Sequence, residues 1–190
     1  MKAETAEQIL DITQELIQAR GFSAISYQDI ADRVGIRKAS IHYHFPTKFA
    51  LGAAVIERYH RRLMATLAAA EATPGASCRD LLAAYLEPFD RFVEGGDKVC
   101  LCGALAGEFA ALPRAMQEQV SRFFTEQQAW LERLFERARA AGELRFAGTP
   151  RDAARLCFSA LQGALLVRRA TGDGQQIRDV VRSLRNLLQA

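Results

Sequence analysis

Polar side chains suited to nucleic-acid contact gather between residues 26 and 48. Their hydroxyl, amide, imidazole and cationic groups are the kinds that bond phosphate oxygens and base edges. Those early in the stretch 37–44 would reach base edges. Tyr43 could instead pack in the core, and His44 or Ser26 could serve as helix caps. The candidates are Ser26, Gln28, Arg37, Lys38, Ser40, His42, Tyr43, His44 and Lys48.

Two short helices joined by a tight turn would position these groups. Gly35 falls where the turn needs a left-handed backbone, which costs glycine little. Apolar residues on both sides would hold the helix pair together, and they are Ile30, Val34, Ile36 and Ile41. Phe45 and Phe49 are expected in the core. This layout is that of a helix-turn-helix, whose second helix enters the DNA major groove.

The rest of the chain is predicted to be all-α, with about nine helices. Apolar residues recur at helical spacing, and 49% of the 190 residues are hydrophobic, enough for a sizeable core. We expect a helix-turn-helix DNA-binding domain over 1–47 and a helical domain over 48–190. The expected helices span about 5–20, 26–34, 38–45, 48–72, 78–94, 100–112, 114–141, 150–171 and 173–189.

The charge is small overall but unevenly distributed. The formal net charge is only +3. Between residues 33 and 62, one acidic residue, Glu57, stands against seven cations, which are Arg33, Arg37, Lys38, Lys48, Arg58, Arg61 and Arg62. A local basic patch is typical of a DNA-binding face, although a solvated charged surface would look the same without the motif.

The residues give little support to a membrane protein, a secreted protein, a zinc protein or an enzyme. No apolar run approaches the roughly 20 residues that span a bilayer, and no secretory leader is visible, so we expect a cytoplasmic protein with reduced thiols and no membrane partner. The single Cys-Leu-Cys lacks the paired spacing of a zinc site. Without a nucleophile–base pair, a phosphate loop or a metal cluster, neither an enzyme nor a cofactor is predicted.

The chain resembles the TetR family of bacterial repressors, most strongly over residues 6–59. The resemblance rests on Ala19-Arg20-Gly21-Phe22, on Ile30-Ala31 to Gly35-Ile36, and on Ser40-Ile41-His42-Tyr43-His44-Phe45 followed by Lys48. It implies a repressor that binds a palindromic operator and is released by a small effector. The family most often has tyrosine at the place of His42, so base preference at this position is open.

The same resemblance implies a homodimer through the last two helices. Their apolar residues are Leu156, Phe158, Leu161, Leu165, Leu166, Ile177, Val180, Val181, Leu184, Leu187 and Leu188. An intramolecular core is the alternative use of these side chains. The effector, apolar or aromatic and of unknown identity, would bind among the middle helices. Its candidate contacts are Met64, Tyr85, Phe89, Leu101, Leu105, Glu108, Phe109, Phe124, Gln127 and Trp130.

Cys100 is a possible thiol sensor. The segment from Cys100 to Glu108 resembles one found in TetR regulators that answer to reactive electrophiles. At the start of a helix, with Lys98 nearby, this thiol would favour its reactive thiolate. The alternative is that all four cysteines are small buried hydrophobic residues. An electrophile- or redox-triggered repressor is therefore the second predicted function.

Overall fold

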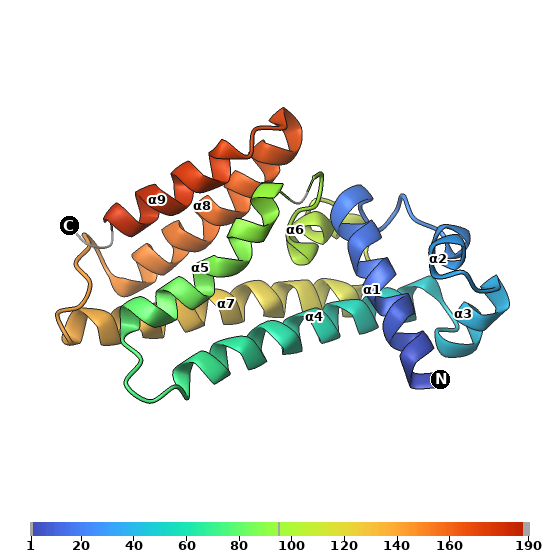
Figure 1. Ribbon diagram of the computed structural model, residues 1–190, viewed down its shortest axis with the longest axis horizontal. Helices are drawn as coiled ribbons and strands as arrows, with labels where there is room; N and C mark the ends of the chain where they lie inside the picture. The colour runs from blue at the N-terminus through green and yellow to red at the C-terminus, as the bar shows by residue number, and fades with distance from the viewer. Residues whose placement is uncertain (1, 95, 188–190) are drawn as a thin grey trace. The chain divides into compact units, whose positions relative to one another are not determined.

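The computed structural model describes residues 2–94 and 96–187, and over these ranges the chain forms α-helices and one 3-10 turn but no strand (Figure 1). The prediction of an all-α chain with about nine helices is confirmed. The elements are α1 Lys2–Arg20, α2 Tyr27–Val34, α3 Lys38–His44, α4 Lys48–Glu71, α5 Cys78–Glu94, α6 Leu101–Ala106, η1 Phe109–Ala111, α7 Arg114–Ala140, α8 Pro150–Thr171 and α9 Gln175–Leu187.

The helices pack as two compact units. The first contains residues up to 61 together with 97–123, and the second contains 62–96 with the residues from 124 onwards. The division therefore falls within α4 rather than before it, where the sequence suggested a domain limit. The first turns of α4 belong to the first unit because Leu51, Val55 and Ile56 are buried there. A Cβ atom at Gly52 would lie 2.7 Å from Phe22.

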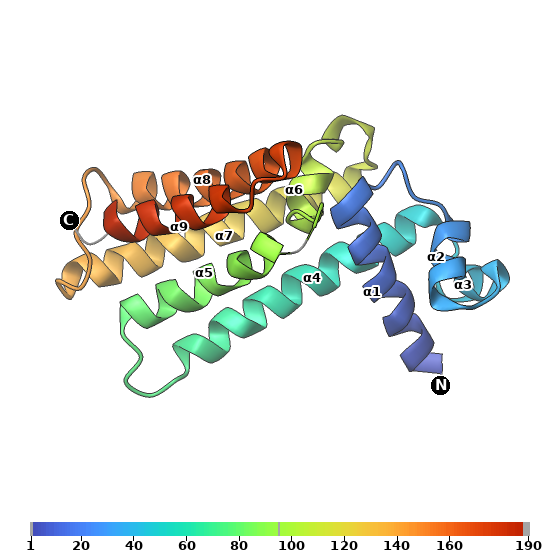
Figure 2. The ribbon, with the colours of Figure 1, turned by 45° about the horizontal axis from the view of Figure 1, so that its top comes forward.

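The first unit builds its helix-turn-helix from local signals that the sequence displays. Ser26 caps α2 in a capping box with Asp29. Gly35 ends α2 in the left-handed conformation, with φ of 77°. Ile30 and Ile41, one on each helix of the motif, are completely buried. In Figures 1 and 2, α2 and α3 lie side by side next to the start of α4.

A buried arginine fastens α4 to α1 in the same unit. The Arg58 side chain is 3% exposed and pairs with Glu7 and Asp11, each at 2.9 Å. It also donates to the Glu7 carbonyl at 3.3 Å. A buried guanidinium needs such partners because an unpaired buried charge is costly. The first half of α4 is therefore fixed to the helix that supports α2 and α3.

The second unit is a helical layer in which α8 and α9 run side by side in both views (Figures 1 and 2). Thr149 and Asp152 form a capping box at the start of α8, and Gly172 ends it with φ of 73°. The Arg168 guanidinium, nearly buried, donates to the Phe92 carbonyl at the end of α5. These contacts tie the ends of α5 and α8 together.

Several boundaries differ from the predictions. Helix α1 begins at Lys2, not near Thr5. The helix expected over 100–112 ends at Ala106 and gives way to η1, because Gly103 and Gly107 weaken a helix that has only six residues. Helix α9 is described to Leu187, so Leu188 and the expected end at Gln189 lie outside the described residues.

Phe49 was expected in the core but is 52% exposed, because its position near the start of α4 points it toward solvent beside the Phe22 ring. Within the described ranges, no helix has both the length and the apolar character that a membrane crossing requires.

Candidate nucleic-acid interface

Helix α3 presents a row of polar side chains to solvent while a single apolar residue anchors it. Ile41 is fully buried. Lys38 and His42 are exposed, and Tyr43 is 68% exposed. The exposure of Tyr43 excludes the alternative that it packs in the core. Because the buried Ile41 side chain holds α3 against the rest of the unit, the opposite face of the helix is exposed and can contact a DNA duplex.

The end of α3 is held by a residue that the sequence interpretation missed, Tyr27. Its hydroxyl donates to the Phe45 carbonyl at 2.7 Å, and its ring meets the His42 ring edge-on at 4.6 Å. Burial raises the pKa of the Tyr27 hydroxyl, so it remains a donor. His42 Nδ1 lies 3.4 Å from the Pro46 carbonyl. The sign of this role available in the sequence was an aromatic residue, Tyr27, directly after the capping residue Ser26.

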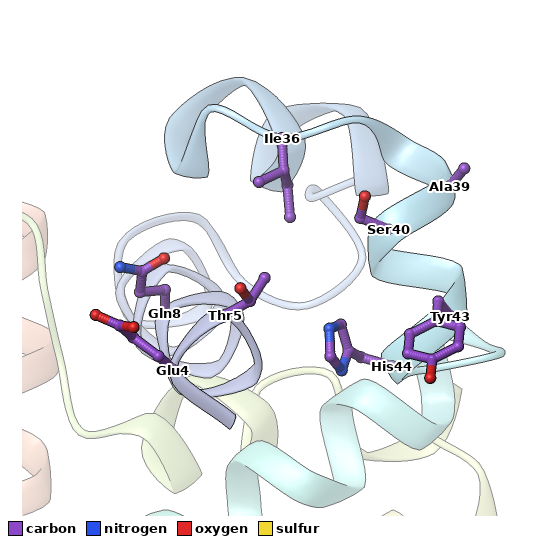
Figure 3. Close-up of a pocket in the computed structure, with 8 residues that line it drawn as sticks. All are labelled: Glu4, Thr5, Gln8, Ile36, Ala39, Ser40, Tyr43 and His44. Carbon is purple, nitrogen blue, oxygen red and sulfur yellow. The ribbon is translucent and has the colours of Figure 1, made fainter. Parts of the chain in front are cut away.

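A hollow of about 740 Å³ runs between α1 and α3 (Figure 3). Ser40, Tyr43 and His44 line it from α3, and Tyr43 and His44 meet edge-on at 5.2 Å. Residues Glu4, Thr5 and Gln8 line it from α1. Ser40 and His44 are thus half-buried at the edge of the α3 face rather than fully exposed on it.

Two predicted contacts on α2 are already engaged within the protein. The Ser26 hydroxyl donates to the Asp29 carboxylate at 2.5 Å, and the Ser26 amide donates to it at 2.7 Å. These bonds lower the pKa of Asp29. Gln28 donates to Asp32 at 2.7 Å. Ser26 is therefore a helix cap in the protein without DNA. Gln28 would have to give up its hydrogen bond to Asp32 before it could bond a DNA base.

Lys48 lies against the turn between α1 and α2. Its Nζ atom is 4.7 Å above the Phe22 ring and 3.4 Å from the Ser23 carbonyl. Partial burial lowers the pKa of Lys48, and the carboxylates of Glu108 and Asp29 partly offset this. Arg37, the cap residue of α3, makes no side-chain capping bond and is exposed. Both cations remain suitable for phosphate contact.

The predicted effector contacts divide between the two units. Met64, Tyr85, Phe89, Phe124, Gln127 and Trp130 belong to the second unit. Within it the Tyr85 ring stacks on Trp130 at 5.5 Å, and the Gln127 amide lies 3.4 Å from the Met64 sulfur. Leu101, Leu105, Glu108 and Phe109 belong to the first unit, so the ten residues do not form one cluster inside either unit.

Glu108, a predicted effector contact, is hydrogen-bonded within the first unit. Its carboxylate accepts the backbone N–H groups of Phe22 at 2.7 Å and Ser23 at 2.8 Å. Those two bonds engage the Glu108 carboxylate, which the sequence predicts as an effector contact. Leu101 and Leu105 are fully buried, whereas Phe109 is 38% exposed on η1. Nothing in the sequence near Glu108 indicates a partner 86 residues away.

Cys100 lies just before α6 rather than inside it, and it is 4% exposed. The Tyr59 hydroxyl contacts its sulfur at 3.8 Å. The other three thiols are buried, and burial raises the pKa of Cys78, of Cys102 and of Cys157, the last to about 12. Lys98 pairs with Glu15 at 3.7 Å.

Over the described residues, no group of three or more histidine, cysteine or acidic side chains could hold a metal.

Known proteins share this architecture along the whole chain. The family described as "Bacterial regulatory proteins, tetR family" matches residues 9–55, and the one described as "Tetracyclin repressor-like, C-terminal domain" matches residues 74–184. A solved TetR-family transcriptional regulator from Agrobacterium tumefaciens is 31% identical, with a TM-score of 0.92 and 100% of each chain covered.

Two curated relatives are also similar. The HTH-type transcriptional repressor NemR of Escherichia coli strain K12 is 25% identical over 97% of this chain and 94% of its own. The HTH-type transcriptional repressor DhaR of Mycobacterium sp. strain GP1 is 25% identical over 77% of this chain and 73% of its own. The helix-turn-helix geometry and the two matched domains lead to one conclusion: the chain belongs to the TetR family of DNA-binding transcriptional regulators.

Proposed function

We propose that this protein is a repressor that binds a palindromic operator as a homodimer and is released by a small apolar or aromatic effector. The observation that carries the proposal is the exposed row of Lys38, His42 and Tyr43 on a helix whose Ile41 is buried. Repression is supported by the similarity of the chain to NemR and DhaR, which are transcriptional repressors.

The outer side of α8 supports the homodimer. Leu156, Leu166 and Val167 are 58%, 51% and 44% exposed. Open space surrounds the position of a Cβ atom at Gly163, so a second helix could approach closely there. Apolar side chains gathered on one helix face mark interaction surfaces. A two-fold dimer presents two copies of α3 to matching half-sites, which is why a palindrome is expected.

Two buried polar atoms in the second unit support an effector that carries a hydroxyl group. The Gln127 Oε1 and Trp130 Nε1 atoms have no hydrogen-bond partner within the described residues. They lie three residues apart on α7 and so share a face. A hydroxyl oxygen can accept from Trp130 while its hydrogen goes to Gln127. Each unmet group costs about 1–3 kcal/mol, so a ligand that satisfies both gains affinity.

Selection of bound fragments from the genome of the source organism tests the proposal. We expect recovered fragments to share an inverted repeat and to bind more tightly than a scrambled duplex at about 0.1 M salt. Lys38→Ala and His42→Ala should relax the consensus at single positions in each half. Arg114→Ala removes an exposed cation outside α3 and serves as the control. Equal binding to consensus and scrambled duplexes would contradict the proposal.

A thiol-triggered repressor is the second candidate, and the contact of Tyr59 with Cys100 favours it. A nearby phenol can donate to a thiolate and so stabilise the reactive form. Cys100→Ser separates the two triggers, because release by a non-electrophilic effector would persist and release by an electrophile would disappear. Mass spectrometry after a brief alkylating pulse should find Cys100 labelled first. Equally slow labelling of all four thiols would exclude this candidate.

A further inference from the structure

The segment that contains α6 is attached to the DNA-binding helices at both of its ends. Before α6, Gln18 of α1 donates through Nε2 to the Val99 carbonyl at 3.1 Å, and Val99 donates its N–H to the Gln18 carbonyl at 3.1 Å. After α6, the Glu108 carboxylate takes the two amides of Phe22 and Ser23. Gln18 and Val99 are both buried, so the first attachment is shielded from water.

The carboxylate of Glu108 fits the turn between α1 and α2 closely. Gly21, the first residue of that turn, has φ of 87°. A Cβ atom there would lie 2.2 Å from Glu108 Oε1. Position 21 therefore needs glycine for two reasons: the left-handed backbone and the close approach of the Glu108 carboxylate. Each oxygen accepts one N–H group that belongs to no helix, and charge-assisted bonds of this kind are among the stronger ones.

The same turn leads directly to the predicted phosphate contacts. Ser26 follows it as the cap of α2. Lys48 contacts the Ser23 carbonyl and lies over the Phe22 ring. Glu108 and Lys48 therefore hold the same two residues, one through the N–H groups and the other through a carbonyl and a ring.

We propose that Glu108 is a positioning residue for operator binding: its carboxylate sets the turn that holds Lys48 in place for contact with DNA phosphates. A displacement of α6 that withdraws the carboxylate leaves the Phe22 and Ser23 amides without this acceptor and releases the turn. Effector binding or thiol modification that moves α6 would in this way reach the DNA-contacting residues. The proposal rests on the operator binding proposed above.

The test compares Glu108→Gln with Glu118→Gln in the full-length protein. The first variant keeps the size of the side chain but turns one acceptor into a donor that faces an N–H group. Glu118 is an exposed acid on α7 of the same unit that pairs with Arg114, so it is the matched control. We expect Glu108→Gln to lower operator affinity by about tenfold or more.

The salt dependence of binding distinguishes positioning from general damage. Loss of folded protein lowers the active fraction without changing the slope of log K against log salt. Displacement of Lys48 should reduce the slope by about one unit. An unchanged affinity and slope in Glu108→Gln, with the control and the parent protein both binding operator, would overturn the proposal. Failure of the parent to prefer any duplex would instead contradict the proposed function.

Hydrogen exchange in the unsubstituted protein keeps the proposal testable if the variant does not fold. The Phe22 and Ser23 amides lie outside every helix, yet their bonds to Glu108 should slow their exchange well below that of the Ala24 amide. Addition of operator DNA should slow them further. Exchange of both amides as fast as that of Ala24 would overturn the proposal.

Discussion

At the scale of single residues, the exposed polar groups of α3 are held in place by partners that are distant in the sequence. Lys38, His42 and Tyr43 belong to one short motif, so type and spacing place them together. Tyr27 contacts Phe45 across 18 residues, and Glu108 contacts Phe22 across 86. Periodicity along one helix carries no information about such distant partners, so only the fold reveals them.

Lys48→Ala should weaken binding to all duplexes alike. Its ammonium group lies beside a turn rather than on α3, so it supplies charge to the backbone and no base readout. We expect the salt slope to fall by about one unit, with the selected consensus unchanged. Arg91→Ala, an exposed cation on α5, should leave the slope as it was. A slope that does not change in Lys48→Ala would remove this residue from the phosphate contacts.

Gln127→Met should raise the stability of the free protein and weaken the effector response. Methionine fills a similar volume and removes the unpaired Oε1 atom, at the loss of the weak contact with Met64. The expected gain is about 1 kcal/mol in the free energy of unfolding, measured by urea denaturation. Gln128→Met on the same helix is the comparison. A clear loss of stability in Gln127→Met would show that the amide already has a partner.

At the scale of elements, helix starts followed from sequence more closely than helix ends. Ser26 was predicted as a possible helix cap, and it forms a capping box with Asp29. Thr149 with Asp152 does the same for α8, and Ser77 with Asp80 repeats the pattern before α5. The predicted end of α6 was wrong because glycine is tolerated inside some helices and ends others. The tertiary surroundings of the glycine decide between these two outcomes.

Acid should destabilise the protein through these three caps. Hydrogen bonds from Ser26, Ser77 and Thr149 lower the pKa of their partner aspartates. A carboxylate with a lowered pKa in the folded state stabilises it above the unfolded value near 3.8, and this is lost as pH falls through the folded pKa. Urea midpoints at pH 6 and pH 3 should therefore differ less in Asp80→Asn than in the parent. Asp90→Asn, within α5, should match the parent.

At the scale of the whole molecule, helix number and class were predictable from apolar periodicity, but the grouping of helices was not. The end of the helix-turn-helix motif suggested a division after residue 47. The packing instead divides α4 itself, because Arg58 binds Glu7 and Asp11 of α1. A continuous helix gives no sign in its own sequence of where its partners change.

Leu166→Glu should convert a dimer to monomers if α8 forms the proposed interface. The side chain is 51% exposed in one copy, so the substitution costs the isolated chain little. Burial of a charge between two helices is costly. Light scattering should report half the mass, and operator affinity should fall by at least about tenfold because one half-site remains. Ala83→Glu, at an exposed position on α5, controls for added acid, and a dimeric Leu166→Glu would place the interface elsewhere.

The contact of His42 with Pro46 has a consequence for which nucleotide the protein selects. A carbonyl at Nδ1 favours the tautomer with its hydrogen on that atom, which leaves Nε2 as a lone-pair acceptor facing outward. Such an atom suits the exocyclic amines of adenine and cytosine, whereas an imidazolium would suit guanine O6 and N7. Sequence selection should therefore return adenine or cytosine at the position of the half-site that His42 contacts, and His42→Ala should relax the choice at that position.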